Sequence, residues 1–307
     1  MTSPIPIIQA DIFTDRPFAG NPAAAVLDAE GLDEVIMLRI AAEMLVPGTA
    51  FVSASTAPSA DWRLRMFTPK REVAYSGHTT LGATHALLES GRLPAGHVTF
   101  DTAAGVVRVE AEHGEGPPVM WLEPALPACR ALDHDLVEVL AALGLSRAGL
   151  AGWARPAVTP DGDLLLPLPD LATLRALQPD MTRLAALRTA QQARGVCCVS
   201  RETVEAGSGT HSRFFAPHYG LPEDIVTGSV HSPLAVWLLE AGVLRATGDR
   251  VTFTAEQGDG LGRPGRLRIE LTVVGGRARR VRVGGQAVTV LSGSLRPGPA
   301  QSRTGSL

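Results

Sequence analysis

Two loops of the chain carry the residue types that proton transfer needs, and both loops follow the same local pattern. Each pattern begins with Arg-x-Phe-x-Pro, at residues 65–69 and 213–217, and continues with an acid, a glycine and an apolar stretch of helical spacing. The glycine is followed by His78 in the first loop and by Ser229 in the second. Two copies of one strand–loop–helix unit, about half the chain apart, predict a duplicated fold with a pseudo-two-fold axis.

Both loops lead into a helix N-terminus, where backbone N–H groups are unpaired and the helix dipole favours negative charge. We expect the two termini to face each other between two domains and to bind a small carboxylate substrate there. The dipole would lower the pKa of His78 and leave a neutral imidazole, which can donate or accept a proton near pH 7. Asp224, which lies shortly before Gly228, is the predicted catalytic carboxylate opposite this histidine.

Other polar residues of the two loops are candidates for binding rather than for proton transfer. Thr79 and Ser229 have an alternative interpretation as plain N-caps. Glu223 is expected to be solvated, and His231 to be structural. The predicted substrate-binding residues are Gly77, Thr79, Gly228, Ser229, Ser76 and Tyr75.

The composition narrows the class of protein. A chain of 307 residues is long enough for two domains, and 45% hydrophobic with 19% charged residues is typical of a globular protein. A net charge of −3 and an aromatic content of 5% argue against binding to nucleic acid or to an anionic membrane. No apolar run approaches the ~20 residues that span a bilayer. Lys70 is the only lysine, so any Schiff-base mechanism would have to use it.

The three cysteines predict neither a disulfide framework nor a zinc site. Cys197 and Cys198 are adjacent in the apolar segment GVCCVS, which is typical of a buried strand, and Cys129 is isolated. The G-x-G-x-x-G match at residues 260–265 contains Pro264 and leads into a strand, which excludes a dinucleotide-binding turn. We therefore expect a reduced, cytoplasmic protein.

Hydrophobic periodicity predicts a mixed α+β chain with a domain boundary at the proline-rich residues 123–129. The expected domains are residues 1–124 and 130–275, followed by a terminal strand region at 276–293 that packs back on the first domain and a flexible tail at 294–307. The predicted helices cover residues 33–44, 79–89, 136–143, 171–176, 181–193 and 229–241. The predicted strands cover residues 5–13, 21–27, 50–55, 62–67, 97–102, 105–111, 119–122, 164–168, 196–200, 213–215, 251–254, 267–274 and 278–290.

Six segments, which include SGHTTLG and EDIVTGS, carry a specific resemblance; they are residues 10–32, 49–52, 65–87, 213–242, 257–265 and 281–293. The chain resembles the phenazine-biosynthesis PhzF-like family, which shares the diaminopimelate epimerase-like fold. The resemblance implies an α+β architecture of two similar domains, each a barrel-like mixed sheet around a central helix, with the active site between them. It also implies no metal, no organic cofactor and a homodimer.

The family's functional residues carry over at three positions and fail at a fourth. The histidine of its G-H-x-T-L-G motif falls on His78, the aspartate of its E-D-P-V-T-G-S motif on Asp224, and the serine of that motif on Ser229. The family's proposed proton-shuttling glutamate is replaced by Gly48, which has no side chain to move a proton. The cysteines of amino-acid epimerases of this fold are replaced by Ser76 and Ser229, whose hydroxyls are too weakly acidic to stand in for thiols.

Three functions remain open. The first hypothesis is a cofactor-independent isomerase that moves a proton and a double bond in a small conjugated carboxylate, using Asp224, His78 or both. The resemblance implies a place in specialised, antibiotic-type metabolism, because family members without the glutamate include isomerases of substituted pyrroline carboxylates on the way to 4-alkylproline. A conjugated substrate would suit the missing base, since its carbanion is delocalised. The second hypothesis is a catalytically silent binding protein, and the third is an amino-acid racemase or epimerase.

Overall fold

The fold is known from a computed structural model, which describes residues 4–93, 96–114, 116–132, 135–191 and 194–296. The chain divides into two compact units. Unit 1 consists of residues 1–120 and 286–307, and unit 2 consists of residues 121–285. Each unit is built on one mixed sheet, and the strand β8 (Gly116–Leu122) spans the boundary between them.

The sheet of unit 1 has the strand order β18–β1–β2–β3–β4–β6–β7. The pairs β2–β3 and β4–β6 are parallel and the other pairs are antiparallel, while the two-residue strand β5 pairs with β4. Among the described residues no pairing joins β7 back to β18, so the sheet is barrel-like without closing. The strands are β1 (Ile5–Ile12), β2 (Asn21–Val26), β3 (Gly48–Ala54), β4 (Trp62–Phe67), β5 (Glu72–Val73), β6 (Gly96–Thr102), β7 (Gly105–Gly114) and β18 (Ala287–Leu295).

The sheet of unit 2 repeats this topology in the order β9–β10–β11–β12–β13–β15–β16–β17. Here β11–β12 and β13–β15 are the parallel pairs, and the short strand β14 pairs with β13 as β5 does with β4. The predicted duplication is therefore confirmed strand by strand. The strands are β9 (Arg130–Ala131), β10 (Ala157–Val158), β11 (Asp163–Pro167), β12 (Gly195–Ser200), β13 (Ser208–Ala216), β14 (Leu221–Asp224), β15 (Arg250–Gln257), β16 (Gly265–Val274) and β17 (Arg277–Gly285).

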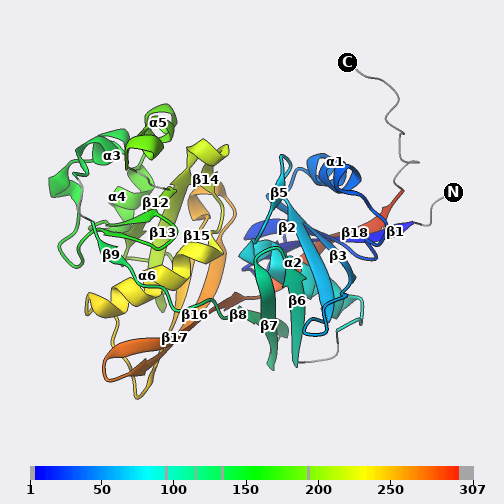
Figure 1. The fold of residues 1–307 in the computed structure, drawn as a ribbon. Helices are drawn as coiled ribbons and strands as arrows, with labels where there is room; N and C mark the ends of the chain where they lie inside the picture. The colour runs from blue at the N-terminus through cyan, green and yellow to red at the C-terminus, as the bar shows by residue number, and fades with distance from the viewer. Residues whose placement is uncertain (1–3, 94–95, 115, 133–134, 192–193, 297–307) are drawn as a thin grey trace. The chain divides into compact units, whose positions relative to one another are not determined.

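One helix in each unit is buried on nearly all sides, as a central helix must be. These helices are α2 (Gly77–Glu89) in unit 1 and α6 (Gly228–Glu240) in unit 2 (Figure 1). In α6 every residue from 230 to 239 is buried. In α2 the backbone comes close to strand β2, because a Cβ on Gly82 would lie 2.9 Å from Cβ of Ala23.

Further helices cover the opposite face of each sheet. In unit 1, α1 (Glu34–Met44) packs against alternate residues of the strands, including Phe51 and Phe67. In unit 2, alternation sends Cys198 towards the outer helices and Cys197 towards α6. Burial raises the pKa of the Cys198 thiol to about 12, so this predicted buried pair is unreactive. The outer helices of unit 2 are α3 (Val137–Ala142), α4 (Leu171–Ala176) and α5 (Met181–Gln191).

Several predicted bounds need correction. The single strand predicted over residues 278–290 is two strands, β17 and β18, which belong to different units and meet at Gln286. The alternation of residue types runs through this point, so only the change of pairing partner marks the break. The last residues of β18 fall in the predicted tail, of which residues 297–307 lie outside the described residues. Residues 192–193 of the predicted helix over 181–193 also lie outside them.

The short elements went unpredicted because two to four residues carry no readable period. They are β5, β9, β10, β14 and the 3₁₀ turns η1 (Arg147–Gly149), η2 (Pro217–Tyr219) and η3 (Asp259–Leu261). Within the described residues, no helix combines the length and the apolar character that crossing a membrane requires.

Candidate active site

The site in unit 1 is a cluster of hydroxyl groups and an imidazole at the start of α2. Ser76 is the N-cap, and its Oγ lies 3.2 Å from His78 Nδ1 and 2.8 Å from Thr79 Oγ1. Thr79 Oγ1 in turn lies 3.4 Å from His78 Nε2. Thr79 is therefore inside the helix, and its interpretation as an N-cap is wrong. Both ring nitrogens of the histidine have a hydroxyl within reach at the positive end of the helix dipole.

Gly48, at the start of β3, packs directly against this cluster. A Cβ at this position would lie 1.9 Å from Thr79 Oγ1 and 3.0 Å from His78 Nε2. Thr79 is fully buried, so its hydroxyl fills the space that a side chain at position 48 would need. Tyr75 lies just before the N-cap and is 39% exposed. Position 48 thus belongs to the His78 cluster in space, although nearly thirty residues separate the two in sequence.

The site in unit 2 holds Asp224 at the end of β14, just before α6. Thr227, the N-cap of α6, donates from Oγ1 to Asp224 Oδ2 at 2.7 Å. The side-chain amide of Gln257 donates to Asp224 O at 2.9 Å and to Thr227 Oγ1 at 3.1 Å, and it accepts from Thr227 N at 3.1 Å. Thr227 and Gln257 are both buried. The Asp224 loop is therefore tied to the end of β15 by one amide.

Backbone packing brings the turn after Gln257 against the same loop. Gly258 has φ +92, and a Cβ there would lie 2.7 Å from Ile225 O and 2.4 Å from Arg263 O. A non-glycine residue is excluded both by this conformation and by these carbonyl groups. Val226 of the loop is fully buried, and it occupies the space that a Cβ on Gly265 would need. These contacts fix the path of the chain between Asp224 and α6.

A guanidinium group lies beside the first turn of α6. Arg194 donates from Nη2 to Ser229 Oγ at 3.3 Å and from Nε to Asp163 Oδ1 at 2.8 Å. Asp163 is fully buried, and burial raises the pKa of its carboxyl group while the ion pair with Arg194 opposes that shift. Ser229 lies inside the helix, so it is not the N-cap. The Arg194 guanidinium thus contacts the first turn of α6, while Asp163 and Asp161 balance its charge.

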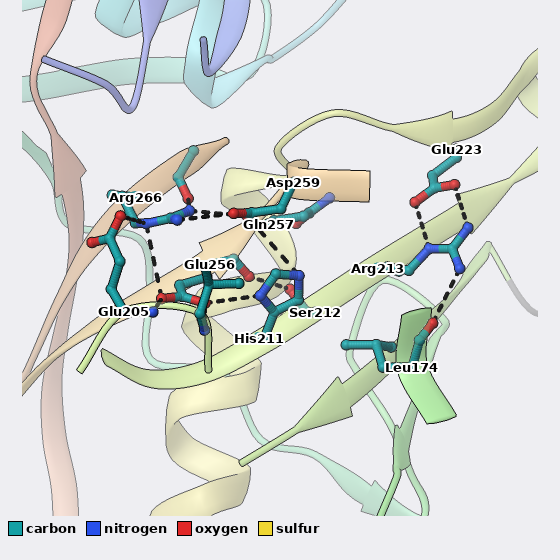
Figure 2. A network of polar contacts seen from close by, with 12 residues as sticks. Leu174, Glu205, His211, Ser212, Arg213, Glu223, Glu256, Gln257, Asp259 and Arg266 are labelled. Atoms are coloured by element: carbon teal, nitrogen blue, oxygen red, sulfur yellow. Dashed lines mark hydrogen bonds and ion pairs between the residues drawn. The ribbon is translucent and has the colours of Figure 1, made fainter. Parts of the chain in front are cut away.

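Glu223 was expected to be solvated, and this is wrong. Arg213 donates from Nε and Nη2 to the two carboxylate oxygens of Glu223 at 2.8 Å each, and only 12% of the Glu223 side chain is exposed (Figure 2). The same bidentate pair occurs in unit 1, where Arg65 binds Glu72 at 2.7 Å and lowers the pKa of that carboxyl group. The acid in each repeat is thus the partner of the repeat's own arginine.

His231 is structural, as the sequence suggested. Its Nδ1 lies 2.8 Å from Thr227 O, one helical turn earlier, and its Nε2 lies 3.4 Å from Ser212 Oγ. Burial lowers the pKa of His231 to about 4, so the ring is neutral at pH 7 and donates from Nδ1–H to the carbonyl.

The predicted site residues thus form two groups. Unit 1 brings together Gly48, Tyr75, Ser76, Gly77, His78 and Thr79, and unit 2 brings together Asp224, Gly228 and Ser229. His78 and Asp224 belong to different units, and their approach to one substrate stays a prediction. Thr227, Gln257 and Arg194, which contact these groups, were not predicted from the sequence. The position of Thr227 directly before Gly228 was the one available signal. Among the residues that the structure describes, no cluster of three or more His, Cys, Asp or Glu side chains could hold a metal ion.

Comparison with known proteins gives consistent matches. The family described as phenazine biosynthesis-like protein (PhzC-PhzF) matches residues 10–293. An uncharacterised isomerase of Deinococcus radiodurans is 35% identical over 286 residues, which cover 92% of this chain and 91% of that protein. The crystal structure of the Bacillus anthracis phenazine biosynthesis protein of the PhzF family superposes with a TM-score of 0.87 at 26% identity, covering 96% of this chain and 100% of that one. A probable proline racemase from Agrobacterium radiobacter shares the fold alone, with a TM-score of 0.62 at 16% identity over 97% of this chain and 94% of that one.

Proposed function

Because the chain belongs to the PhzC-PhzF family of phenazine biosynthesis-like proteins, an isomerase and epimerase family, we propose that it is a cofactor-independent isomerase. The resemblance and the duplicated α+β fold predicted from the sequence are confirmed. The proposed reaction moves a proton, and with it a double bond, within a small conjugated carboxylate. The observation that carries the proposal is the Asp224 carboxylate, held by a hydroxyl donor at the start of α6.

The proposed reaction is a balanced proton transfer. The Asp224 carboxylate takes a proton from carbon, so that a C–H bond breaks and an O–H bond forms, and the electron pair delocalises into the conjugated system. A proton then returns to a different carbon from Asp224 or from His78. The substrate's carboxylate would be held by backbone N–H groups at the start of α2 and α6 and by Arg194. Substrate and product are isomers, and no oxidant or reductant is needed.

A conjugated substrate fits the chemistry of position 48. Gly48 offers no base, so the proton that is removed must be acidic enough for the Asp224 carboxylate, which a delocalised carbanion provides. A substituted pyrroline carboxylate on the way to 4-alkylproline, in antibiotic-type metabolism, is the substrate we propose. A cytoplasmic homodimer belongs to the same proposal. The serines at positions 76 and 229 argue against a racemase, since such enzymes of this fold use a pair of thiols.

The test is turnover of candidate pyrroline carboxylates in deuterated water, followed by NMR. Deuterium that enters one carbon as the double bond moves supports the proposal. The variant Asp224→Asn should lower the rate roughly 10²–10⁴-fold, the usual scale for the loss of a general base. The variant Asp249→Asn, which neutralises an exposed carboxylate of the same unit, should leave the rate unchanged. If no conjugated carboxylate turns over, and Asp224→Asn leaves ligand binding unchanged, the silent binding protein replaces this proposal.

A further inference from the structure

The Gln257 amide can be oriented in only one way. Its acceptor side faces Thr227 N, which can only donate, and its donor side faces Asp224 O, which can only accept. A flipped amide would break both hydrogen bonds at a buried position, so oxygen and nitrogen are assigned by the backbone itself. The amide therefore sends a hydrogen towards Thr227 Oγ1 at 3.1 Å.

This orientation of the amide determines where the hydrogen of the Thr227 hydroxyl points. One hydrogen of Gln257 Nε2 goes to Asp224 O and the other goes to Thr227 Oγ1. The hydroxyl accepts from Gln257, so its own hydrogen is directed at Asp224 Oδ2, 2.7 Å away. A hydrogen bond from a neutral donor to an ionised carboxylate is stronger than one to a neutral acid. The two hydrogen bonds, from Gln257 to Thr227 and from Thr227 to Asp224, thus stabilise negative charge on Oδ2.

Resting on the proposed function, we propose that Gln257 is a positioning residue that fixes Asp224, through Thr227, as the base of the reaction. Oδ2 accepts the Thr227 hydrogen bond in both protonation states, so the transferred proton is carried on Oδ1. In this proposal Asp224 removes the proton, His78 returns one to the other carbon, and exchange with solvent restores both groups.

The end of strand β15 is held firmly enough to position the amide. Glu256, next to Gln257, is buried and binds His211 at 2.8 Å, and the pKa of its carboxyl group is lowered to about 2 (Figure 2). Desolvation opposes that shift, and the hydrogen bonds from His211 and from two backbone N–H groups outweigh it. On the other side of Gln257 in the sequence, Arg266 donates two hydrogen bonds, of 2.9 and 3.0 Å, to the Asp259 carboxylate. The amide thus lies between two anchored neighbours.

Thr227 and Gln257 variants test this inference. Thr227→Val keeps the shape but removes the hydroxyl, and it should lower kcat roughly 10- to 100-fold with little change in KM, the scale of a lost hydrogen bond to a charged group. Thr227→Ser restores the hydroxyl and should stay within about threefold of the wild type. Gln257→Glu replaces the donor by an acceptor, which draws the Thr227 hydrogen away from Asp224, and it should lower kcat on the same scale as Thr227→Val. Equal kcat values for Thr227→Val and Thr227→Ser would overturn the proposal.

A second readout needs no substrate, so it separates this inference from the proposed function. In protein labelled with ¹³C at aspartate carboxyl groups, the Asp224 resonance, assigned with Asp224→Asn, should move in Thr227→Val and in Gln257→Glu and stay in place in Thr227→Ser. Thermal unfolding of each variant confirms that the fold is intact. An Asp224 signal that is unchanged in Thr227→Val disproves the proposed relay, which is the chain of hydrogen bonds from Gln257 through Thr227 to Asp224. This holds even if the protein converts a pyrroline carboxylate. A shifted signal in a protein that converts no pyrroline carboxylate supports the relay and counts against the proposed reaction.

Discussion

The two units follow the same chain path into their central helices, yet they hold the first helical turns differently. In both units an arginine lies over a phenylalanine of its own strand, with Arg65 5.3 Å from the Phe67 ring centroid and Arg213 4.9 Å from that of Phe215. In both units the arginine also forms a bidentate pair with the acid of the short strand that follows. Both repeats thus keep the same arginine clamp, in which an arginine joins its own strand to the short strand that follows it.

The two arginines differ in the further contacts that they make and in their exposure to water. Arg213 also donates from Nη1 to the carbonyl of Leu174 (Figure 2) and to that of Leu177, both at the end of α4, so the guanidinium bridges strand and helix. Arg65 instead reaches Glu34 of α1, whose side chain is mostly exposed. We therefore expect the two ion pairs to differ in strength, since water screens the more exposed pair in unit 1 and the outer helices cover the pair in unit 2.

The first turns of the two central helices also differ in the side chain that binds the carbonyl group of the N-cap residue. Thr80 in α2 donates from Oγ1 to Ser76 O at 2.9 Å, and His231 in α6 binds Thr227 O at 2.8 Å. Both side chains bond to the carbonyl of the N-cap, four residues earlier. A hydroxyl serves in one unit and a buried neutral imidazole in the other, so only unit 2 has a titratable group in this position.

The largest expected effect tests whether both units take part in the chemistry. His78→Gln and Asp224→Asn should each lower turnover roughly 10²–10⁴-fold. Because the two residues serve one reaction, the double variant should be little worse than the more damaged single variant. Steady-state kinetics of the three variants checks this. A His78→Gln enzyme with full activity would leave unit 1 with a purely structural role, and losses that multiply would show two independent contributions.

The next prediction compares how much each of the two arginine–glutamate pairs contributes to the free energy of unfolding. Arg213→Met leaves Glu223 largely buried without its cation and should cost about 3 kcal/mol of unfolding free energy. Arg65→Met breaks a pair in which 23% and 30% of the side chains are exposed, and it should cost about 1 kcal/mol. Urea unfolding at neutral pH measures both.

Glu223→Gln and Glu72→Gln are the matched controls from the other side of each pair, and they should reproduce the same order. Equal costs for the two arginine variants would mean that the outer helices of unit 2 do not determine the strength of its clamp.

The sequence predicted the elements with a clear period and missed what depends on distant partners. The bounds of β4 and α4 were predicted at both ends, because alternation over residues 62–67 and helical spacing over 171–176 suffice. The two-residue strands β9 and β10 exist only through their pairing, so no local pattern reveals them. In the site, no spacing rule links Gln257 to a loop thirty residues earlier. The ion pair of Glu223 with Arg213 could have been predicted, however, because both copies of the repeat contain an arginine followed by an acid, and the repeat aligns Glu223 with Glu72.

His231 makes stability depend on pH in a window set by its pKa. Its folded-state pKa of about 4 lies below the ordinary 6.5, so the unfolded chain binds the proton more readily. Stability is therefore full above about pH 6.5 and falls as the pH drops towards 4, by at most about 3 kcal/mol. His231→Thr, which copies Thr80 of unit 1, should make this slope shallower, and His85, whose pKa burial also lowers, accounts for part of what remains. Urea unfolding of wild type and variant between pH 7 and pH 4.5 checks it, and identical slopes would contradict the assignment.

The last comparison concerns two glycines at equivalent places, the first residues of β3 and β12. A Cβ on Gly48 would lie 1.9 Å from Thr79 Oγ1, whereas a Cβ on Gly195 would lie 2.3 Å from the end of the Phe214 ring. Gly48→Ala and Gly195→Ala should each cost about 1–3 kcal/mol of stability, the scale of overpacking. Only Gly48→Ala should also slow turnover, because it displaces Thr79 beside His78.

Gly48→Glu, which restores the family's carboxylate, should not improve turnover for the same steric reason, and it adds negative charge beside a carboxylate substrate. Kinetics and thermal unfolding of the three variants decide between these effects. A faster Gly48→Glu enzyme would show that unit 1 has lost a base that the chemistry still requires.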